Sequence, residues 1–292
     1  MTVAIYGRKV TKPLCEQYIH VINSFEKLGS TVILEEELQQ QLIQKAGFGE
    51  GYSSYNSHQD FVSGVDLMIS MGGDGTFIKA VNYIRSSEVP ILGINTGRLG
   101  FLANISIAQI ENTLDRIYRK EYEYQKRSLL RVHTDEDIFG DENFALNELT
   151  LHKKDTSSMI TVHASLDNKY LNSYWADGLI VSTPTGSTAY NLSCGGPIIT
   201  PGCQVHILTP IAPHNLNVRP MVVPDHLPIS LEVEGRDRTY LLSIDGNSKS
   251  IRQGEQVILR KAEFMINVVK FEDNNFLDTI RNKMLWGIDT RN

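Results

Sequence analysis

Three glycines surround one aspartate in the run Gly72, Gly73, Asp74, Gly75 and Thr76. Glycines let the backbone approach a ligand closely, and N–H groups at the start of a following helix favour an anion such as phosphate. A carboxylate in such a cradle repels phosphate, but it is useful if it accepts the proton of a hydroxyl that attacks phosphorus. The structural alternative is a glycine-rich turn in which Asp74 caps the helix. The run therefore predicts either phosphoryl-transfer chemistry or a capped turn.

The two common nucleotide-binding fingerprints do not occur in the sequence. It has no G-x-x-x-x-G-K-[ST] run and no G-x-G-x-x-G run after a predicted strand. A P-loop enzyme and an ordinary dehydrogenase are therefore disfavoured.

Three further segments combine glycine with polar or aromatic side chains. Residues 95–102 follow a predicted strand, and their Phe101 either stacks on a base or fills the core. Asn147 and Glu148 interrupt an apolar run, so they either grip sugar hydroxyls or mark an edge strand or bulge. Residues 177–190 carry five Ser or Thr within seven positions, which offers many donors to a polar ligand.

The first part of the chain alternates predicted strands and helices. Apolar strand-like runs occupy residues 3–6, 31–34, 66–71 and 90–94, and helical spacing marks residues 12–28, the segment from Thr76 and residues 106–122. The alternation predicts a parallel sheet with helices on both faces. Because loops at the carboxyl ends of parallel strands line one crevice, the glycine-rich run and residues 95–102 should face a common ligand. Residues 47–64 are predicted to form a loop.

From about residue 125 the sequence changes to consecutive β-rich runs. They occupy residues 129–134, 144–152, 159–166, 178–182, 229–234, 240–244, 256–261 and 264–269. Turn pairs separate some of them, notably Asp167 with Asn168 and Asp245 with Gly246. This pattern predicts an antiparallel sandwich or a layered β-domain, and residues 275–286 are predicted to be helical again.

The composition is that of an ordinary globular protein of 292 residues with 41% hydrophobic and 21% charged residues. Its formal net charge of -6 disfavours nucleic acid and anionic membranes as partners. Cys15, Cys194 and Cys203 are too few and too scattered for a disulfide framework. No signal peptide and no membrane-spanning run is recognisable. We therefore expect a soluble cytoplasmic protein with reduced thiols.

Taken together, these motifs resemble those of bacterial NAD kinases. The matching residues follow the family order over about 175 positions: 72–76, 96–102, 146–150, 177–190 with Ser193, 195–197, 210–216 and 245–247. The glycine-rich run alone is less specific, because lipid kinases related to diacylglycerol kinases share it. The resemblance implies phosphorylation of the 2′-hydroxyl of the adenosine ribose of NAD⁺ by ATP, giving NADP⁺.

The resemblance also implies roles for individual residues. Asp74 would be the general base. The phosphates would be held by Gly75 and its neighbours, among them Gly73 and Thr76. Lys79 would be a further binding residue, at a position that often holds Arg or His. Asn147 and Glu148 would bind the adenosine, and Phe101 would stack on adenine. The dinucleotide site would be lined by Thr188, Ala189, Tyr190 and Ser193, with Asp177 and Ala212 toward the nicotinamide. Trp175 replaces a usual Arg or Gly at a position associated with donor choice, and Asn247 replaces a usual Gln.

The elements and the resemblance predict a Rossmann-like parallel α/β domain over residues 1–126 and a β-sandwich-like, NAD-binding domain over residues 127–273. The terminal helix, residues 274–292, should pack on the first domain. NAD should bind between the two domains, in a pocket that a neighbouring subunit completes, which implies a homodimer or homotetramer. Mg²⁺ should be carried by the ATP phosphates rather than by a protein metal site, and polyphosphate is an alternative donor.

Two other functions compete with this interpretation. A lipid kinase could share the glycine-rich run, but it needs an apolar entry for an acyl chain, which no segment supplies. A non-catalytic NAD-binding protein is the alternative from another class, but a pure binder has no use for a carboxylate in a phosphate cradle.

Overall fold

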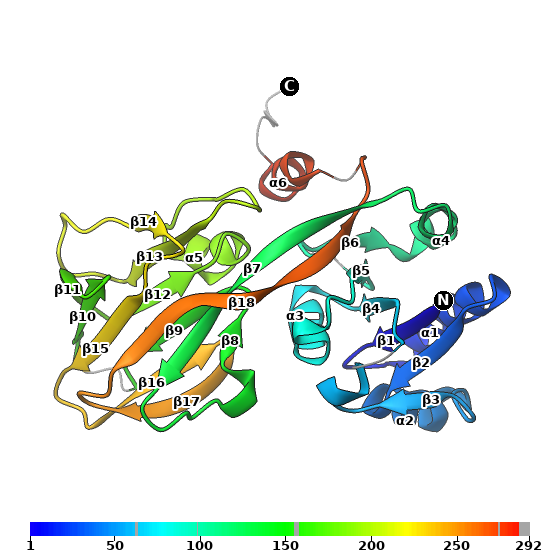
Figure 1. Ribbon diagram of the computed structural model, residues 1–292, viewed down its shortest axis with the longest axis horizontal. Coiled ribbons are helices and arrows are strands. Elements are labelled where there is room, and N and C mark those ends of the chain that lie inside the picture. The colour runs from blue at the N-terminus through cyan, green and yellow to red at the C-terminus, as the bar shows by residue number, and fades with distance from the viewer. Residues whose placement is uncertain (62–63, 98, 155–157, 274, 286–292) are drawn as a thin grey trace. The chain divides into compact units, whose positions relative to one another are not determined.

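The computed structural model describes residues 1–61, 64–97, 99–154, 158–273 and 275–285, and the chain divides into two compact units. Unit 1 comprises residues 1–126 and 266–292, and unit 2 comprises residues 127–265. The chain leaves unit 1 along β7 (Glu123–Thr134) and returns to it along β18 (Val257–Lys270) (Figure 1). No helix of the described residues is long and apolar enough to cross a membrane.

Unit 1 contains a parallel sheet in which the first strand of the chain lies near the centre. Its strands are β1 (Thr2–Tyr6), β2 (Thr31–Glu35), β3 (Ser53–Tyr55), β4 (Leu67–Met71), β5 (Ile91–Asn95) and β6 (Ala103–Ser106). They lie in the order β3-β2-β1-β4-β5, and β6 pairs with β5. The chain runs from β1 to β3 on one side and then returns to place β4 on the other side of β1. This reversal puts a topological switch point between β1 and β4.

Helices cover both faces of this sheet (Figure 1). They are α1 (Lys12–Lys27), α2 (Glu36–Ala46), α3 (Asp74–Ile84) and α4 (Ile110–Tyr118). The unit also contains α6 (Phe276–Met284) and the short 3₁₀ helices η1 (His58–Phe61), η2 (Arg85–Ser87) and η3 (Ile107–Gln109). Alternate strand residues such as Ile5 and Ile69 share one core with α1, α2 and α4. The other face packs against α3, where Phe77 lies under Gly93.

Unit 2 consists of two antiparallel sheets. One contains β11 (Lys169–Ala176), β10 (Ile160–Leu166), β15 (Ile229–Glu234) and β18 in that order, with β7 on β18 and β8 (Phe144–Ala145) on β7. The other has the order β14 (Met221–Pro224), β13 (Val205–Ile211), β12 (Gly178–Ser182), β9 (Glu148–His152), β16 (Thr239–Ile244) and β17 (Asn247–Arg252). The short helices are η4 (Gly140–Glu142), η5 (Gly186–Thr188) and α5 (Tyr190–Ser193). Alternate residues of both sheets form a single core, as a sandwich requires.

The predicted fold class is confirmed, and several element boundaries differ. The predicted hairpin turns are present: Asp167 and Asn168 have φ of 49° and 59°, and Asp245 has φ of 46° before Gly246. The two predicted strands 256–261 and 264–269 form the single strand β18. The predicted loop 47–64 contains β3 and η1. Residues 286–292, which include the end of the predicted terminal helix, lie outside the described residues.

Candidate active site

The carboxylate of Asp74 holds the chain segment that follows β5. Its Oδ2 accepts a hydrogen bond from the N–H of Phe101 at 2.8 Å, and its Oδ1 accepts from Leu102 at 2.9 Å and Ala103 at 3.0 Å. The side chain therefore joins the connections that leave β4 and β5, as the expected common crevice requires. A carboxylate offers about four lone-pair positions, so about one position remains for a further donor.

The glycines around Asp74 have different structural roles. Gly72 has φ of +154°, and a Cβ there would lie 2.4 Å from the hydroxyl of Thr76. A Cβ on Gly100 would lie 1.9 Å from Oδ1 of Asp74. By contrast, a Cβ on Gly73 or Gly75 would meet nothing within 4 Å, so the backbone at these two positions is open to a ligand.

The capping alternative for Asp74 is wrong. Gly73 is the N-cap of α3 and Asp74 is its first residue, while the Asp74 side chain bonds to residues 101–103 instead of the helix. The Asp74 carboxylate thus binds the segment after β5 and forms no hydrogen bond to the N-terminus of α3. Lys79 lies half-buried on the same helix. Five residues separate it from Asp74, which corresponds to about 140° around the helix axis, so the two side chains leave α3 in different directions.

Phe101 contacts the C-terminal helix. The Nζ of Lys283 on α6 lies 4.8 Å from the centroid of the half-buried Phe101 ring, within the range of a cation–π contact. The predicted adenine-stacking residue therefore already has a cationic neighbour on its ring.

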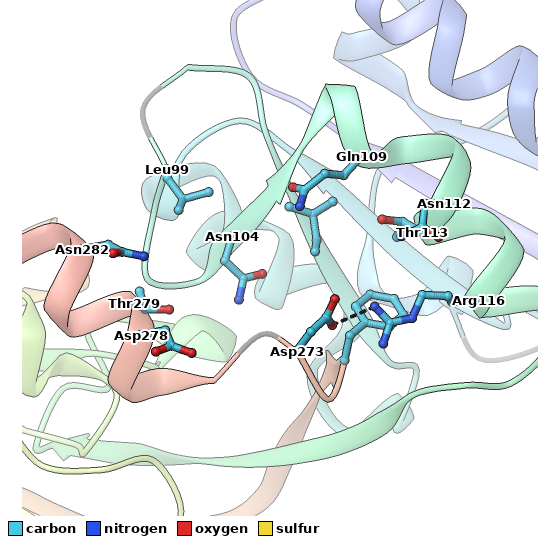
Figure 2. A pocket seen from close by; sticks show the side chains of 12 residues that line it. Leu99, Asn104, Gln109, Asn112, Thr113, Arg116, Asp273, Asp278, Thr279 and Asn282 are labelled. Atoms are coloured by element: carbon cyan, nitrogen blue, oxygen red, sulfur yellow. Dashed lines mark hydrogen bonds and ion pairs between the residues drawn. The ribbon is translucent and has the colours of Figure 1, made fainter.

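A pocket of about 220 Å³ lies between the segment after β5, α4 and α6 (Figure 2). Its charged groups are largely paired, because the Arg116 guanidinium contacts the Asp273 carboxylate at 2.7 Å and lies over the Phe271 ring at 4.4 Å. Amides and hydroxyls form most of the remaining wall: Asn104, Gln109, Asn112, Thr113, Thr279 and Asn282. None of the predicted site residues lines this pocket, so it is separate from the glycine-rich loop.

In unit 2, Asp245 repeats the arrangement found at Asp74. Its carboxylate accepts hydrogen bonds from the N–H groups of three consecutive residues, Leu146 at 2.7 Å, Asn147 at 3.0 Å and Glu148 at 3.0 Å. A Cβ on Gly186 would lie 2.2 Å from the Asn147 carbonyl oxygen, so glycine lets η5 pack directly on this segment. The backbone that carries Asn147 and Glu148 is therefore fixed from two sides.

Glu148 is an acid in an environment that disfavours its charge. Its Oε2 is completely buried and has no hydrogen-bond partner among the described residues. Burial raises the pKa of Glu148 from 4.5 to about 8, and the nearby Asp245 carboxylate adds to the effect. At neutral pH the side chain is therefore mainly a neutral carboxylic acid, which can donate as well as accept a hydrogen bond.

The Ser/Thr-rich segment mostly bonds to the protein itself, which corrects the expectation that its hydroxyls serve a ligand. Thr183 donates to the Leu146 carbonyl at 2.5 Å, and Ser187 donates to the Ile199 carbonyl at 3.2 Å. Ser182 is also fully buried and donates to the Asn147 carbonyl at 3.3 Å. These hydroxyls satisfy buried backbone groups, which would otherwise be costly.

The other residues predicted around this segment remain accessible. Thr188 and Ala189 are half-buried, and Tyr190 and Ser193 are exposed. The pKa of Tyr190 is raised, first by burial and next by Cys194, with smaller contributions from the carboxylates of Asp177 and Glu148. The Tyr190 hydroxyl thus lies within electrostatic reach of both predicted parts of the dinucleotide site.

Trp175, Asp177 and Ala212 line a second pocket of unit 2, with a volume of about 570 Å³. Trp175 is 55% exposed, and its ring centroid lies 5.7 Å from that of His214. Lys153 contacts the Asp177 carboxylate at 2.6 Å. The structure therefore brings these three predicted residues together.

Several lining residues of this pocket were not identified from the sequence: Lys153, Ser158, Met159, His214 and Arg236. Lys153, Ser158, Met159 and Arg236 lie outside the matching segments, whereas His214 lies within the matching segment 210–216 but was not singled out. Asn247 lies at the start of β17, where its amide donates to Glu142 at 3.4 Å.

Family models match almost the whole chain. Residues 3–122 match the ATP-NAD kinase N-terminal domain, and residues 146–271 match the ATP-NAD kinase C-terminal domain. These two matches cover the Asp74 loop and the Asn147–Glu148 segment, respectively.

Curated relatives and solved structures agree with these matches. The chain is 44% identical to an NAD kinase of Flavobacterium psychrophilum and 41% identical to one of Cytophaga hutchinsonii, each over the full length of both chains. It is also similar to an NAD kinase from Archaeoglobus fulgidus solved in complex with ATP, with a TM-score of 0.75, 26% identity and coverage of 98% of this chain and 99% of the other. Yeast NADH kinase, solved with NADH, shares the fold at a TM-score of 0.87 and 24% identity, covering 100% of this chain and 89% of the other. The chain belongs to the NAD kinase family.

Proposed function

We propose that this protein transfers the γ-phosphoryl group of ATP to the 2′-hydroxyl of the adenosine ribose of NAD⁺, giving NADP⁺ and ADP. The observation that carries the assignment is the Asp74 carboxylate, held by three N–H groups beside glycines whose backbone is open. Such an arrangement fixes a proton acceptor next to a surface suited to phosphate.

In the proposed reaction, the 2′-oxygen of NAD⁺ forms a bond to the γ-phosphorus, and the bond from that phosphorus to the β,γ-bridging oxygen breaks. The electron pair of the broken bond leaves with ADP. The hydroxyl proton passes to the remaining acceptor position on Oδ2 of Asp74, because the other positions are occupied by the N–H groups of residues 101–103. Positioning and charge neutralisation then provide most of the acceleration, as is usual in phosphoryl transfer.

We infer that Gly73, Gly75 and Thr76 hold donor phosphates. Lys79 leaves α3 in another direction than Asp74 and would be a further binding residue. Mg²⁺ neutralises phosphate charge when it is bound to the donor. The loop supplies one carboxylate, and three of its roughly four lone-pair positions accept N–H groups. The donor's phosphate oxygens, together with water, would supply the other metal ligands.

We infer that residues of unit 2 bind NAD⁺. Asn147 and the neutral acid of Glu148 suit the hydroxyl and nitrogen atoms of an adenosine, which both donate and accept hydrogen bonds. Thr188, Ala189, Tyr190 and Ser193 would line the dinucleotide. The pocket with Trp175, Asp177 and Ala212 would take the nicotinamide end. Asn247, at the start of β17 after the Asp245 turn, would be a further binding residue. Phe101 would stack on adenine.

We also infer that the protein forms a homodimer or homotetramer. Apolar residues on unit 2 support this, since Leu216 is 88% exposed and lies a few residues after Ala212 of the second pocket. A neighbouring copy that covered Leu216 would lie beside the nicotinamide end.

The experiment that tests the function is to incubate the protein with NAD⁺, ATP and Mg²⁺ and to assay the product with a dehydrogenase specific for NADP⁺. We expect NADP⁺ and ADP in equal amounts. ATP hydrolysis without NADP⁺, or no reaction at all, would contradict the proposal.

A further inference from the structure

The connection after β1 lies beside the glycine-rich loop at the topological switch point of unit 1. In the parallel pairing of β1 with β4, Tyr6 is opposite Ser70, so Arg8 leaves β1 level with Gly72 at the end of β4. Tyr18 of α1 contacts both strand ends: its hydroxyl donates to the Met71 carbonyl at 3.0 Å, and a Cβ on Gly7 would lie 1.9 Å from that hydroxyl. Ligands of open parallel sheets bind outside the carboxyl ends of the strands at such a point.

Hydrogen bonds from α2 fix the backbone of this connection, while the cationic side chains of Arg8 and Lys9 have no hydrogen-bond or ion-pair partner among the described residues. Gln41 of α2 donates to the Arg8 carbonyl at 2.8 Å and accepts from the Val10 N–H at 3.1 Å, and Lys45 donates to the Val10 carbonyl at 2.5 Å. The side chains of Arg8 and Lys9 are exposed. Within the described part of the chain, neither forms an ion pair or a side-chain hydrogen bond.

Two neighbouring carboxylates do not neutralise this pair in the structure. Arg8 acts electrostatically on Tyr6, as do Glu35 and Glu37, so these charges lie in the same region. Glu35 is occupied, because it accepts from the Leu38 N–H at 2.8 Å and from the Tyr83 hydroxyl at 3.3 Å. Glu37 accepts from Gln41 at 3.4 Å. Two cations thus remain available on an anchored loop.

We propose that Arg8 and Lys9 bind the phosphates of the donor, from the β1 side of the switch point, while the glycine-rich loop approaches them from the β4 side. The inference rests on the proposed function and assigns two further binding residues to its donor. Arg8 offers a planar fork that matches two phosphate oxygens, and Lys9 offers a compact point charge. A nucleoside triphosphate is the substrate that needs such charge most, because its chain carries more negative charge than the pyrophosphate of NAD⁺.

The test compares Arg8→Gln/Lys9→Gln with wild type by calorimetric titration of inorganic tripolyphosphate and Mg²⁺, and by the KM values for ATP and NAD⁺. Tripolyphosphate has no nucleoside, so it reports the phosphate contacts alone, and its binding needs no turnover. We expect the Kd for tripolyphosphate and the KM for ATP to rise by about 10- to 100-fold, as for the loss of charge-assisted hydrogen bonds. The KM for NAD⁺ should change by less than about threefold.

Two variants serve as controls. Lys27→Gln removes an exposed cation from the last turn of α1, which ends just before the amino end of β2, and should leave all three constants unchanged. The swap Arg8→Lys/Lys9→Arg keeps both charges and should stay within about threefold of wild type. Unchanged tripolyphosphate binding in the double Gln variant overturns the inference, and so does an equal rise in the KM values for ATP and NAD⁺. A wild-type protein that binds tripolyphosphate through these cations but forms no NADP⁺ would refute the proposed function alone.

Discussion

Replacement of Glu148 by Gln should change the pH dependence of stability in a defined direction. The folded protein raises the pKa of this carboxyl from 4.5 to about 8 through burial and the adjacent Asp245. The folded state therefore holds the proton more tightly than the unfolded state. The stability that Glu148 contributes is fully present below pH 4.5 and is lost as the pH rises through about 8. Glutamine resembles the protonated acid in size and never ionises, so the variant lacks this loss.

The size of the effect follows from the two pKa values. Each pKa unit corresponds to about 1.4 kcal/mol, so the wild type loses up to about 5 kcal/mol across the whole window. Between pH 5.5 and pH 9, the free energy of unfolding of Glu148→Gln minus that of wild type should increase by about 3 kcal/mol. At pH 5.5 the two proteins should differ by only about 1.4 kcal/mol.

The assay is urea unfolding of both proteins at several pH values, with the free energies compared at each pH. Glu232→Gln is the matched control, because Glu232 is exposed on β15 of the same unit. The control should stay parallel to wild type throughout. Parallel curves for Glu148→Gln and wild type would refute the conclusion that Glu148 is protonated in the folded protein at neutral pH.

Three further outcomes are expected. Gly100→Ala would place a Cβ 1.9 Å from Oδ1 of Asp74 and should lower turnover at least about 10-fold by displacing the carboxylate. The control Gly97→Ala, where a Cβ meets nothing within 4 Å, should keep normal turnover. Equal kinetics in both variants would contradict the conclusion that the position of the Asp74 carboxylate matters for turnover. Thiol titration of the denatured, unreduced protein should count three free thiols, as the free cysteines of the structure require, and a lower count would indicate a disulfide. Dilution to monomers should weaken NAD⁺ binding, whereas a fully active monomer in sedimentation would exclude a shared pocket.

Much of the fold was predictable because its signals are local. The spacing of Tyr18, Val21, Ile22 and Phe25 identifies α1, and these side chains are buried as expected. The Asp-Asn and Asp-Gly turn pairs identify two hairpins, since both sites have positive φ. The helix α2 was not predicted, because only Leu38 and Leu42 of its residues are buried and its sequence is otherwise polar.

The sequence singles out candidate site residues, but it does not show which contacts hold them in place. The glycine-rich run points to Asp74, but no sequence pattern shows that its carboxylate holds the amides of residues 101–103, which are 27 to 29 positions away. Asp245 accepts hydrogen bonds from the amides of residues 146–148, at a sequence separation of 97 to 99 positions, so the sequence does not reveal this contact either. The Ser/Thr-rich segment misled the interpretation for a related reason. Hydroxyl composition does not distinguish a donor to a ligand from a donor to buried backbone, and only the packing decides.

The most direct test of the central claim is the turnover of Asp74→Asn measured beside its affinity for NAD⁺. Asparagine keeps the size of the side chain and one acceptor oxygen, so with its NH₂ group toward Phe101 it retains the hydrogen bonds from Leu102 and Ala103. It cannot accept the proton of the 2′-hydroxyl. We predict a kcat for NADP⁺ formation lower by at least about 10²-fold, with the Kd for NAD⁺ changed by less than about tenfold. A variant that forms NADP⁺ at close to the wild-type rate would contradict the assignment of Asp74 as the general base.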